Sequence, residues 1–363
     1  MKSKISVLLV LLLVLTLALS ACKGTPSSDE PFEYGPEIVE EPEPEFFSAL
    51  TGLPVESEED ANRRPTAIMI NNIKKALPQY GISNASIIFE ALAEGGITRL
   101  LAVFDDLSDI PQIGTIRSAR PYYLDFAQSV DAIYIHIGGS PEAYSQIKSR
   151  GMASFDLIEG KNNAMYWRDK GRIQSSGYEH SVFTSGERLL EKFEAEGTRT
   201  TRSSKYGDVF NFSADALYDG SDATKISAKF SSYKTGTYTY DEAIGLYRIG
   251  QYGTSHIDAE TGNQLAFKNV FVLRMNSYVI KGDTAGRLRF DTVGEGSGKY
   301  FVNGTQTDFT WKRSDTSAPF KFYEADGTEL PVLPGDSYVA IVPPDAEVII
   351  EGETLEDISE NLE

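Results

Sequence analysis

The sequence predicts a mixed α/β N-terminal domain followed by a smaller, β-rich C-terminal domain. Three observations support this fold class: a length of 363 residues, alternating strand and helix signals in the first half, and strand-like segments separated by Asn-Gly and Asp-Gly turns in the second half. The predicted organisation is a signal peptide over residues 1–21, a tether over 22–48, an α/β domain over 49–214, a linker over 215–228, a β-rich domain over 229–350 and an acidic tail over 351–363.

The N-terminus has the features of a secretory signal peptide. Lys2 and Lys4 precede an apolar run from Val7 to Leu19, and small residues come just before Cys22. The run is shorter than the roughly 20 apolar residues that a transmembrane helix needs. The sequence Leu-Ser-Ala-Cys resembles the lipobox of bacterial lipoproteins. That resemblance implies cleavage before Cys22 and a diacylglycerol group on its sulfur.

Cys22 is the only cysteine in the chain, so an internal disulfide is excluded. We therefore expect lipid anchoring through Cys22 at the outer face of the cell membrane, where two or more acyl chains give stable attachment. The tether over residues 22–48 combines prolines with many acidic residues, a composition typical of an extended and unfolded spacer.

The chain carries a large excess of negative charge. It has 53 acidic and 34 basic residues, which give a formal net charge of −19 at pH 7. Nucleic acid is excluded as a partner on this ground, because it is bound by basic surfaces. Membrane attachment is expected to depend on the acyl chains, since the tether offers no cluster of basic residues for anionic lipid.

Short apolar runs in the first half predict buried strands. These runs cover residues 66–70, 87–89, 100–104 and 132–137, and each is bounded by turn-forming residues. Their alternation with helix signals is the basis for the α/β assignment.

Three helices are expected between and after these strands. The first begins at Pro121 and runs to about Ser129. The second has Ser140 as its N-cap, followed by a proline at the first helical position. The third begins with a capping box over residues 184–187 and is closed by Gly197.

The second half is predicted to consist mostly of strands. Residues 271–275 and 338–342 are strand-like, and the dipeptides at 303–304 and 326–327 indicate hairpin turns. The Gly-x-Gly-x-Gly segment at 294–298 lacks the spacing of a dinucleotide-binding loop and is not followed by a helix signal. We interpret it as a turn with an unusual backbone conformation.

Several segments, taken in order, resemble the YerB-like lipoproteins, a two-domain bacterial family whose biochemical role is not established. They are Asn71-Asn72, Leu77 to Gly81, Glu90 to Arg99, Ile116 to Arg120, His136 to Pro141, Gly294 to Tyr300 and Thr310 to Lys312. The resemblance implies a lipoprotein with an α/β domain and a β-rich domain. It supplies no catalytic residues.

Three arginines and two helix starts form the best candidate for a ligand site. Arg117 and Arg120 precede the helix that begins at Pro121. Arg99 follows a Gly-Gly turn, and Ser140 starts the second helix. Helix N-termini and arginine side chains both favour anions, and strand ends that lead into helices are where open α/β sheets bind ligands. The alternative is that the arginines form internal salt bridges with the acidic residues Glu90, Glu94 and Asp125.

Catalytic roles for three residues are left open by the sequence. Glu90 and Glu94 either face one cleft as the two carboxylates of a glycosidase, or form a surface or salt-bridged pair. His136 either lines the ligand pocket or is a hydrogen-bonded core histidine. The three histidines of the chain are far apart and no motif indicates a cofactor, so we expect neither a metal site nor a cofactor.

The function predicted from these features is that of a non-catalytic binding or accessory protein of the cell envelope. It is expected to recognise either an anionic ligand or a partner in wall assembly, and the expected partners are cell-wall glycan or the proteins of wall synthesis. The alternative is an envelope enzyme acting on cell-wall glycan or lipid-linked pyrophosphate. The placement of arginines after a strand is similar to that in the LytR-CpsA-Psr enzymes, which use such arginines to hold a polyprenyl pyrophosphate.

Overall fold

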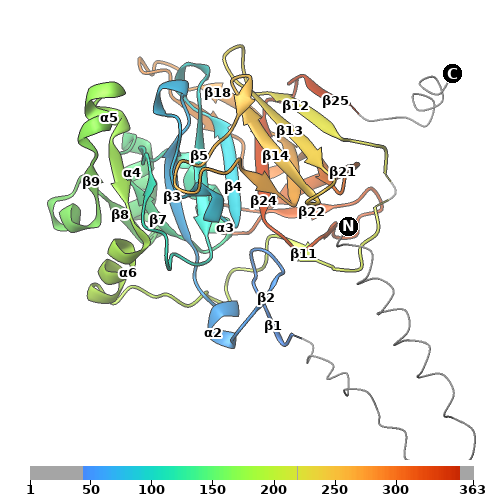
Figure 1. Ribbon diagram of the computed structural model, residues 1–363, viewed down its shortest axis with the longest axis horizontal. Helices are drawn as coiled ribbons and strands as arrows, with labels where there is room; N and C mark the ends of the chain where they lie inside the picture. Colours follow the sequence, from blue (N-terminus) through green and yellow to red (C-terminus); the bar gives the residue numbers. More distant parts are fainter. Residues whose placement is uncertain (1–43, 219, 352–363) are drawn as a thin grey trace, which may run out of the picture. The chain divides into compact units, whose positions relative to one another are not determined.

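The computed structural model describes residues 44–218 and 220–351 (Figure 1). Cys22, the predicted signal peptide, most of the predicted tether and nearly all of the acidic tail lie outside the described residues. Within the described part of the chain, no helix is both long enough and apolar enough to span a membrane.

Ten strands form one sheet that contains strands from both halves of the chain (Figure 1). In spatial order they are β22 (Lys321–Tyr323), β21 (Thr305–Arg313), β20 (Gly294–Val302), β17 (Asn269–Arg274), β24 (Ser337–Val342), β4 (Ile87–Leu92), β5 (Thr98–Phe104), β3 (Thr66–Asn71), β7 (Ile133–His136) and β8 (Ser154–Asp156). β24 and β4 pair in parallel, with Tyr338 opposite Ile88, and so join the two halves. The division into two domains at residues 215–228 stays a prediction.

The fold class predicted from the sequence is confirmed, with an α/β first half and a largely β second half. All six predicted strands are present as β3, β4, β5, β7, β17 and β24, and differ from the prediction by a few residues at their ends. Every residue of β3, β4 and β5 is buried, because both faces of the sheet are covered.

Alternate residues along the central strands face two different cores. On one face, Ile68 and Ile88 share a core with Tyr238 of a second, six-stranded sheet. On the other face, Met69 and Phe89 share a core with the helix α3, whose Phe126 ring stacks on Phe89 with 5.3 Å between centroids.

The second sheet and the remaining small sheets come mostly from loops of the large one. The six-stranded sheet has the order β15 (Thr254–Ser255), β14 (Leu246–Gln251), β13 (Thr235–Asp241), β12 (Lys225–Lys229) and β25 (Val348–Glu351), with β16 (Ala266–Phe267) also paired to β14. A three-stranded sheet has the order β6 (Ile113–Gly114), β10 (Val182–Thr184) and β9 (Trp167–Arg168). Two-stranded sheets are β1 (Phe46–Phe47) with β2 (Pro54–Val55), β11 (Asn211–Phe212) with β23 (Pro331–Val332), and β18 (Ser277–Val279) with β19 (Leu288–Phe290).

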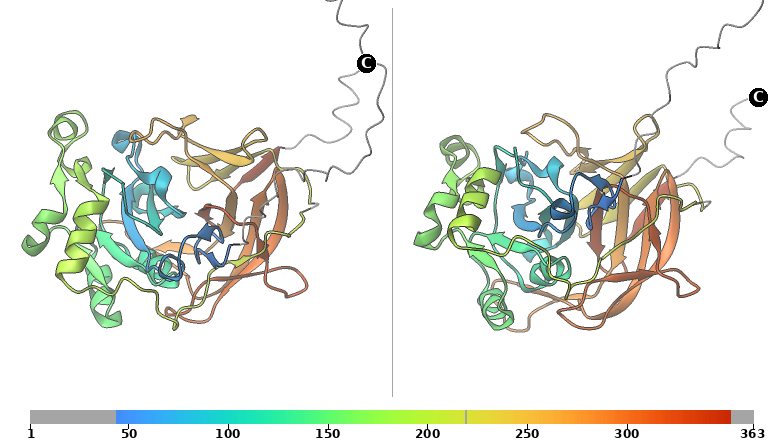
Figure 2. Two further views of the ribbon diagram at one scale, coloured as in Figure 1. Left: turned by 60° about the horizontal axis from the view of Figure 1, so that its bottom comes forward. Right: turned by 90° about the horizontal axis from the view of Figure 1, so that it is seen from below.

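Within the described residues the helices belong to the first half, and α4, α5 and α6 lie on the side of the molecule where β7 and β8 end the large sheet (Figures 1 and 2). The α-helices are α2 (Glu58–Ala61), α3 (Pro121–Ser129), α4 (Pro141–Arg150), α5 (Lys170–Ser175) and α6 (Gly186–Ala195). The short 3₁₀ helices are η1 (Lys74–Ala76), η2 (Ile82–Asn84), η3 (Glu94–Gly96), η4 (Gly160–Met165) and η5 (Tyr178–His180).

The three helices predicted from the sequence are confirmed as α3, α4 and α6. Ser140 caps α4 as expected, because its hydroxyl accepts a hydrogen bond from the Ala143 amide. The capping box predicted for α6 is wrong in one detail. Ser185, and not Thr184, is the N-cap residue, and its hydroxyl accepts from the Arg188 amide. Gly197 lies just beyond the helix with φ of 60°, the left-handed conformation that ends many helices.

The glycine-rich segment at 294–298 is not a turn, so that prediction was wrong. It begins strand β20, which pairs with β21 along its whole length. A Cβ atom on Gly298 would lie 2.3 Å from the Phe309 ring, and one on Gly296 would lie 2.6 Å from the Trp311 ring. The glycines are therefore explained by aromatic rings that cross over them from β21. The hairpin turn predicted at 303–304 is confirmed between the same two strands.

Candidate functional site

The candidate site lies at the sheet end where β3 and β7 finish and β5 begins. Asn71 at the end of β3 is opposite Arg99 at the start of β5. The loop that carries Arg117 and Arg120 crosses this end. It is fixed by hydrogen bonds from the Arg117 amide to the Met69 carbonyl, at 2.9 Å, and from the Ala119 amide to the Gly138 carbonyl, at 2.9 Å. The convergence of strand ends therefore brings the three arginines to one region.

Two of the three arginines hold one carboxylate, that of Glu94. Arg99 Nη2 lies 3.2 Å from Glu94 Oε2, and Arg120 contacts both carboxylate oxygens, with Nη2 3.0 Å from Oε2. Arg99 also donates to the Ser118 carbonyl at 2.8 Å. Burial alone would raise the pKa of Glu94, but the Arg120 hydrogen bond and the charges of Arg99 and Arg120 outweigh it and place this pKa below its usual value. We call Glu94, Arg99 and Arg120 the Glu94 clamp.

The internal salt bridges suggested by the sequence are present only in part. Glu94 pairs with Arg99 and Arg120, but Glu90 and Asp125 have other partners. Asp125 pairs with Arg150 and Arg313. The clamp orders the loop over residues 115–120, because Arg99 holds its backbone at Ser118 and Arg120 is itself part of it.

Arg117 points away from the clamp toward η5. Its guanidinium contacts the Glu179 carboxylate, with Nη2 3.2 Å from Oε2, and the Glu179 side chain is 63 % exposed. His180 next to it is buried, and Asn71 Nδ2 lies 2.7 Å from its Nδ1. With Nδ1 as acceptor, Nε2 carries the proton and faces Glu179 at 3.3 Å. Burial lowers the pKa of His180 despite the Glu179 charge, and nearby cations lower it further, so we expect a neutral ring at pH 7.

Four basic side chains lie near η5: Arg117 and Arg168 contact its residues Glu179 and Tyr178, and Lys75 and Arg172 are close enough for their charges to lower the pKa of His180. We call this the η5 surface. Among the ion pairs of the described residues, only Arg117 of these four has a carboxylate partner, Glu179. Arg168 and Arg172 instead donate to backbone carbonyls, those of Tyr178 at 2.7 Å and Ala76 at 2.8 Å. The surface is therefore basic in a chain whose net charge is −19.

Three of these four cations, Lys75, Arg168 and Arg172, were not predicted from the sequence. Arg168 and Arg172 come from neighbouring positions in β9 and α5, whereas Lys75 comes from η1, far away along the chain. One signal was available: residues 168–172 contain three basic residues in an otherwise acidic chain. Asp169 lies within this segment, where its carboxylate accepts from the Arg172 amide and caps α5.

Glu90 is not at the candidate site. It lies in β4 with 0 % exposure, and its carboxylate contacts Lys234 Nζ at 2.8 Å and the Tyr338 hydroxyl at 2.6 Å. It also accepts from Asn72 and Thr98. Glu90 and Glu94 therefore belong to separate groups of contacts, one in the interior and one at the rim.

His136 and Ser140 are also occupied by internal contacts. His136 is buried at the end of β7, with Nδ1 2.8 Å from the Gly138 carbonyl and Nε2 3.1 Å from Ser154 Oγ. The Ser140 hydroxyl caps α4. Within the described ranges, no group of three or more histidine, cysteine, aspartate or glutamate side chains is placed to hold a metal ion.

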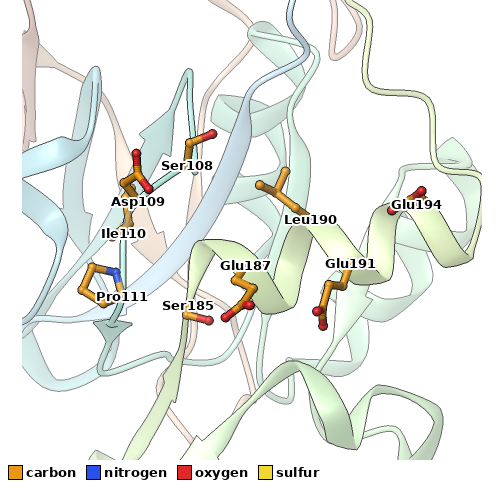
Figure 3. Close-up of a pocket in the computed structure, with 9 residues that line it drawn as sticks. All are labelled: Ser108, Asp109, Ile110, Pro111, Ser185, Glu187, Leu190, Glu191 and Glu194. Atoms are coloured by element: carbon orange, nitrogen blue, oxygen red, sulfur yellow. The ribbon is translucent and has the colours of Figure 1, made fainter.

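A groove of about 730 Å³ lies between residues 108–111 and helix α6 (Figure 3). Its lining includes the carboxylates of Asp109, Glu187, Glu191 and Glu194, with Leu190 between them. None of the three candidate arginines lines this groove. Since carboxylates repel anions, this groove does not suit the anionic ligand predicted from the sequence.

Comparison with known proteins gives matches over most of the chain. Residues 50–199 match the model described as "Protein of unknown function (DUF3048) N-terminal domain", and residues 226–339 match the corresponding C-terminal domain. "Putative lipoprotein YerB" of Bacillus subtilis (strain 168) is 33 % identical over 316 residues, which cover 84 % of this chain and 88 % of the relative. The crystal structure of the YerB protein from Bacillus subtilis superposes with a TM-score of 0.72 at 29 % identity, covering 84 % of this chain and 100 % of that one.

Proposed function

The chain belongs to the DUF3048 family, whose N-terminal and C-terminal domain models match its two halves, and on this basis we propose that it is a lipid-anchored envelope protein. In this proposal the protein binds an anionic polymer and does not catalyse a reaction. Cys22 is the proposed lipid site, in agreement with the word lipoprotein in the name of the Bacillus subtilis relative. The proposed binding surface is the η5 surface.

The observation that carries this proposal is the uncompensated charge of the η5 surface. Among the described residues, Lys75, Arg168 and Arg172 face solvent or backbone carbonyls, and the exposed carboxylate of Glu179 is the one ionic partner of Arg117. An incoming phosphate or carboxylate group can displace such a partner, because exposed ion pairs are worth at most about 1 kcal/mol. Clustered cations also raise the association rate of a polyanion.

The Glu94 clamp supports the same function indirectly. It fixes the backbone of the loop that carries Arg117, and the Arg117 guanidinium is itself held at the surface by Glu179 before a ligand arrives. Ordering a long side chain in advance reduces the entropy that binding would otherwise cost. In this proposal Arg99 and Arg120 position Arg117 and do not contact the ligand.

The enzymatic alternative has less support from the contacts of the residues it needs. A glycosidase requires two carboxylates at one cleft. Glu90 is fully buried against Lys234, and Glu94 is held by two arginines. The contacts of His136 are internal. These contacts favour binding without catalysis.

The test is a binding titration of the full-length protein in detergent micelles with fluorescently labelled inorganic polyphosphate. We expect the double variant Lys75→Gln, Arg117→Gln to bind about tenfold more weakly at moderate salt, because each phosphate contact releases counterions. The slope of log affinity against log salt concentration should become shallower by the equivalent of about two phosphate contacts.

The matched control is Lys225→Gln, Lys229→Gln, which removes the same charge from two exposed side chains of strand β12. It is expected to bind like the wild type. Wild-type protein that does not bind polyphosphate, or equal weakening by both double variants, contradicts the proposed function.

A further inference from the structure

An exposed aromatic ring, that of Tyr178, lies in η5 beside the cations of the η5 surface. Tyr178 is the first residue of η5 and is 63 % exposed. The guanidinium carbon of Arg168 lies 3.7 Å from the centre of its ring. A ring with one face covered in this way reaches such exposure only if its other face is open to solvent. Tyr178 therefore presents one free aromatic face beside four cations.

The backbone of Tyr178 is fixed by two neighbouring side chains. Arg168 Nη1 and Ser181 Oγ both donate to the Tyr178 carbonyl, at 2.7 Å and 2.8 Å. Arg168 belongs to β9, where it is opposite Val182 of β10, and β10 pairs in turn with β6. The backbone that carries the ring is thus anchored to a three-stranded sheet, and Arg168 of the same sheet covers one face of the ring, so that a ligand stacking on it would cost little ordering.

The chemistry around the ring matches a sugar that carries an acidic group. The C–H face of a pyranose is apolar, and it packs favourably on the electron-rich face of an aromatic ring. Arg117 is bound to Glu179, the residue after Tyr178, so a cation for the acidic group is adjacent. The exposed Glu179 carboxylate can accept hydrogen bonds from the hydroxyls of a sugar. Polyphosphate and a DNA backbone do not offer such hydroxyls.

We propose that Tyr178 is a stacking platform for a sugar ring of an anionic glycan, whose acidic groups bind Arg117 and its neighbouring cations. This inference rests on the proposed function and narrows it, because a ligand that used charge alone would not need the ring. It names the ligand class as an acidic polysaccharide and assigns Tyr178 a direct contact with it.

The experiment compares two probes, hyaluronan oligosaccharide and inorganic polyphosphate, on full-length protein in detergent micelles. For Tyr178→Ala we expect hyaluronan binding to weaken about tenfold, the loss of one stacking contact, while polyphosphate binding stays unchanged. Tyr178→Phe keeps the ring and is the matched control, with hyaluronan binding close to the wild type. Because Tyr178 is exposed, all variants should fold, which equal thermal midpoints would verify.

The outcomes separate this inference from the proposed function. If Tyr178→Ala binds hyaluronan as the wild type does, while Lys75→Gln, Arg117→Gln weakens polyphosphate binding, the platform is refuted and the proposed function stands. If the wild type binds neither probe, both fail. If a single-stranded DNA oligonucleotide binds more tightly than hyaluronan and depends on Tyr178, the ring serves a nucleobase and the glycan assignment is overturned.

Discussion

Replacement of Lys234 by methionine is expected to lower the free energy of unfolding by about 3–5 kcal/mol. Lys234 is 1 % exposed, and its ammonium group lies 2.8 Å from Glu90 Oε1 and 2.7 Å from Gln251 Oε1. Burial lowers the pKa of Lys234, and the Glu90 carboxylate opposes this shift. Without the lysine, Glu90 would remain as a buried charge with only neutral hydrogen-bond donors around it.

The Glu90–Lys234 ion pair also joins the two sheets, which is why its loss should lower the stability of the whole fold. Glu90 lies in β4 of the ten-stranded sheet, and Lys234 directly precedes β13 of the six-stranded sheet. We expect the double variant Lys234→Met, Glu90→Gln to recover a large part of the lost stability, because both charges leave together.

Urea unfolding followed by circular dichroism measures these differences. Lys225→Met is the control, since the Lys225 side chain is 48 % exposed, and should stay within about 0.5 kcal/mol of the wild type. If Lys234→Met were no more harmful than Lys225→Met, the Glu90–Lys234 pair would not be the stabilising contact described above.

The second large effect is expected for Glu94→Gln at the Glu94 clamp. Removing this carboxylate leaves the charge of the buried Arg99 without its partner, and we expect a loss of about 3 kcal/mol at neutral pH. A carboxyl whose pKa is lowered by folding stabilises the protein above its unfolded pKa, and this contribution disappears as the pH falls through the folded pKa. The difference between wild type and variant should therefore shrink on acidification below about pH 4.

Parallel urea titrations at neutral and acidic pH test this dependence. Glu295→Gln is the control, because the Glu295 side chain is exposed and lies 3.8 Å from Lys312. It should have little effect at either pH. A stability difference for Glu94→Gln that stayed constant, or grew, toward acidic pH would rule out an ionised Glu94 as the centre of the clamp.

The elements of the fold could be predicted where local sequence determines them. The strands around Ile68 and Leu101 follow from short apolar runs, and α4 follows from its serine cap and the proline after it. The parallel pairing of β24 with β4 could not be predicted, because it depends on which distant strands meet in the sheet. The segment with Gly296 and Gly298 was predicted wrongly for the same reason. Glycine is required there because aromatic rings of the neighbouring strand leave no space for a Cβ atom.

The site could be predicted only in part, for similar reasons. The convergence of Arg99, Arg117 and Arg120 follows from their positions next to strand ends, and the structure places them in one region. That Glu94 pairs with two of them depends on the conformation of η3. The cations of the η5 surface come from three segments, around Lys75, around Arg117 and over residues 168–172, and the sequence of the basic segment 168–172 does not show that it meets the other two.

The most direct test of the central proposal, that the η5 surface binds an anionic polymer, is hydrogen–deuterium exchange of the wild-type protein with and without polyphosphate. Slower exchange is predicted in the segments that form this surface, residues 72–80, 115–120 and 166–182, while β12 and β21 remain unchanged. Protection that appears in the β-rich half and is absent from these three segments would contradict the proposal.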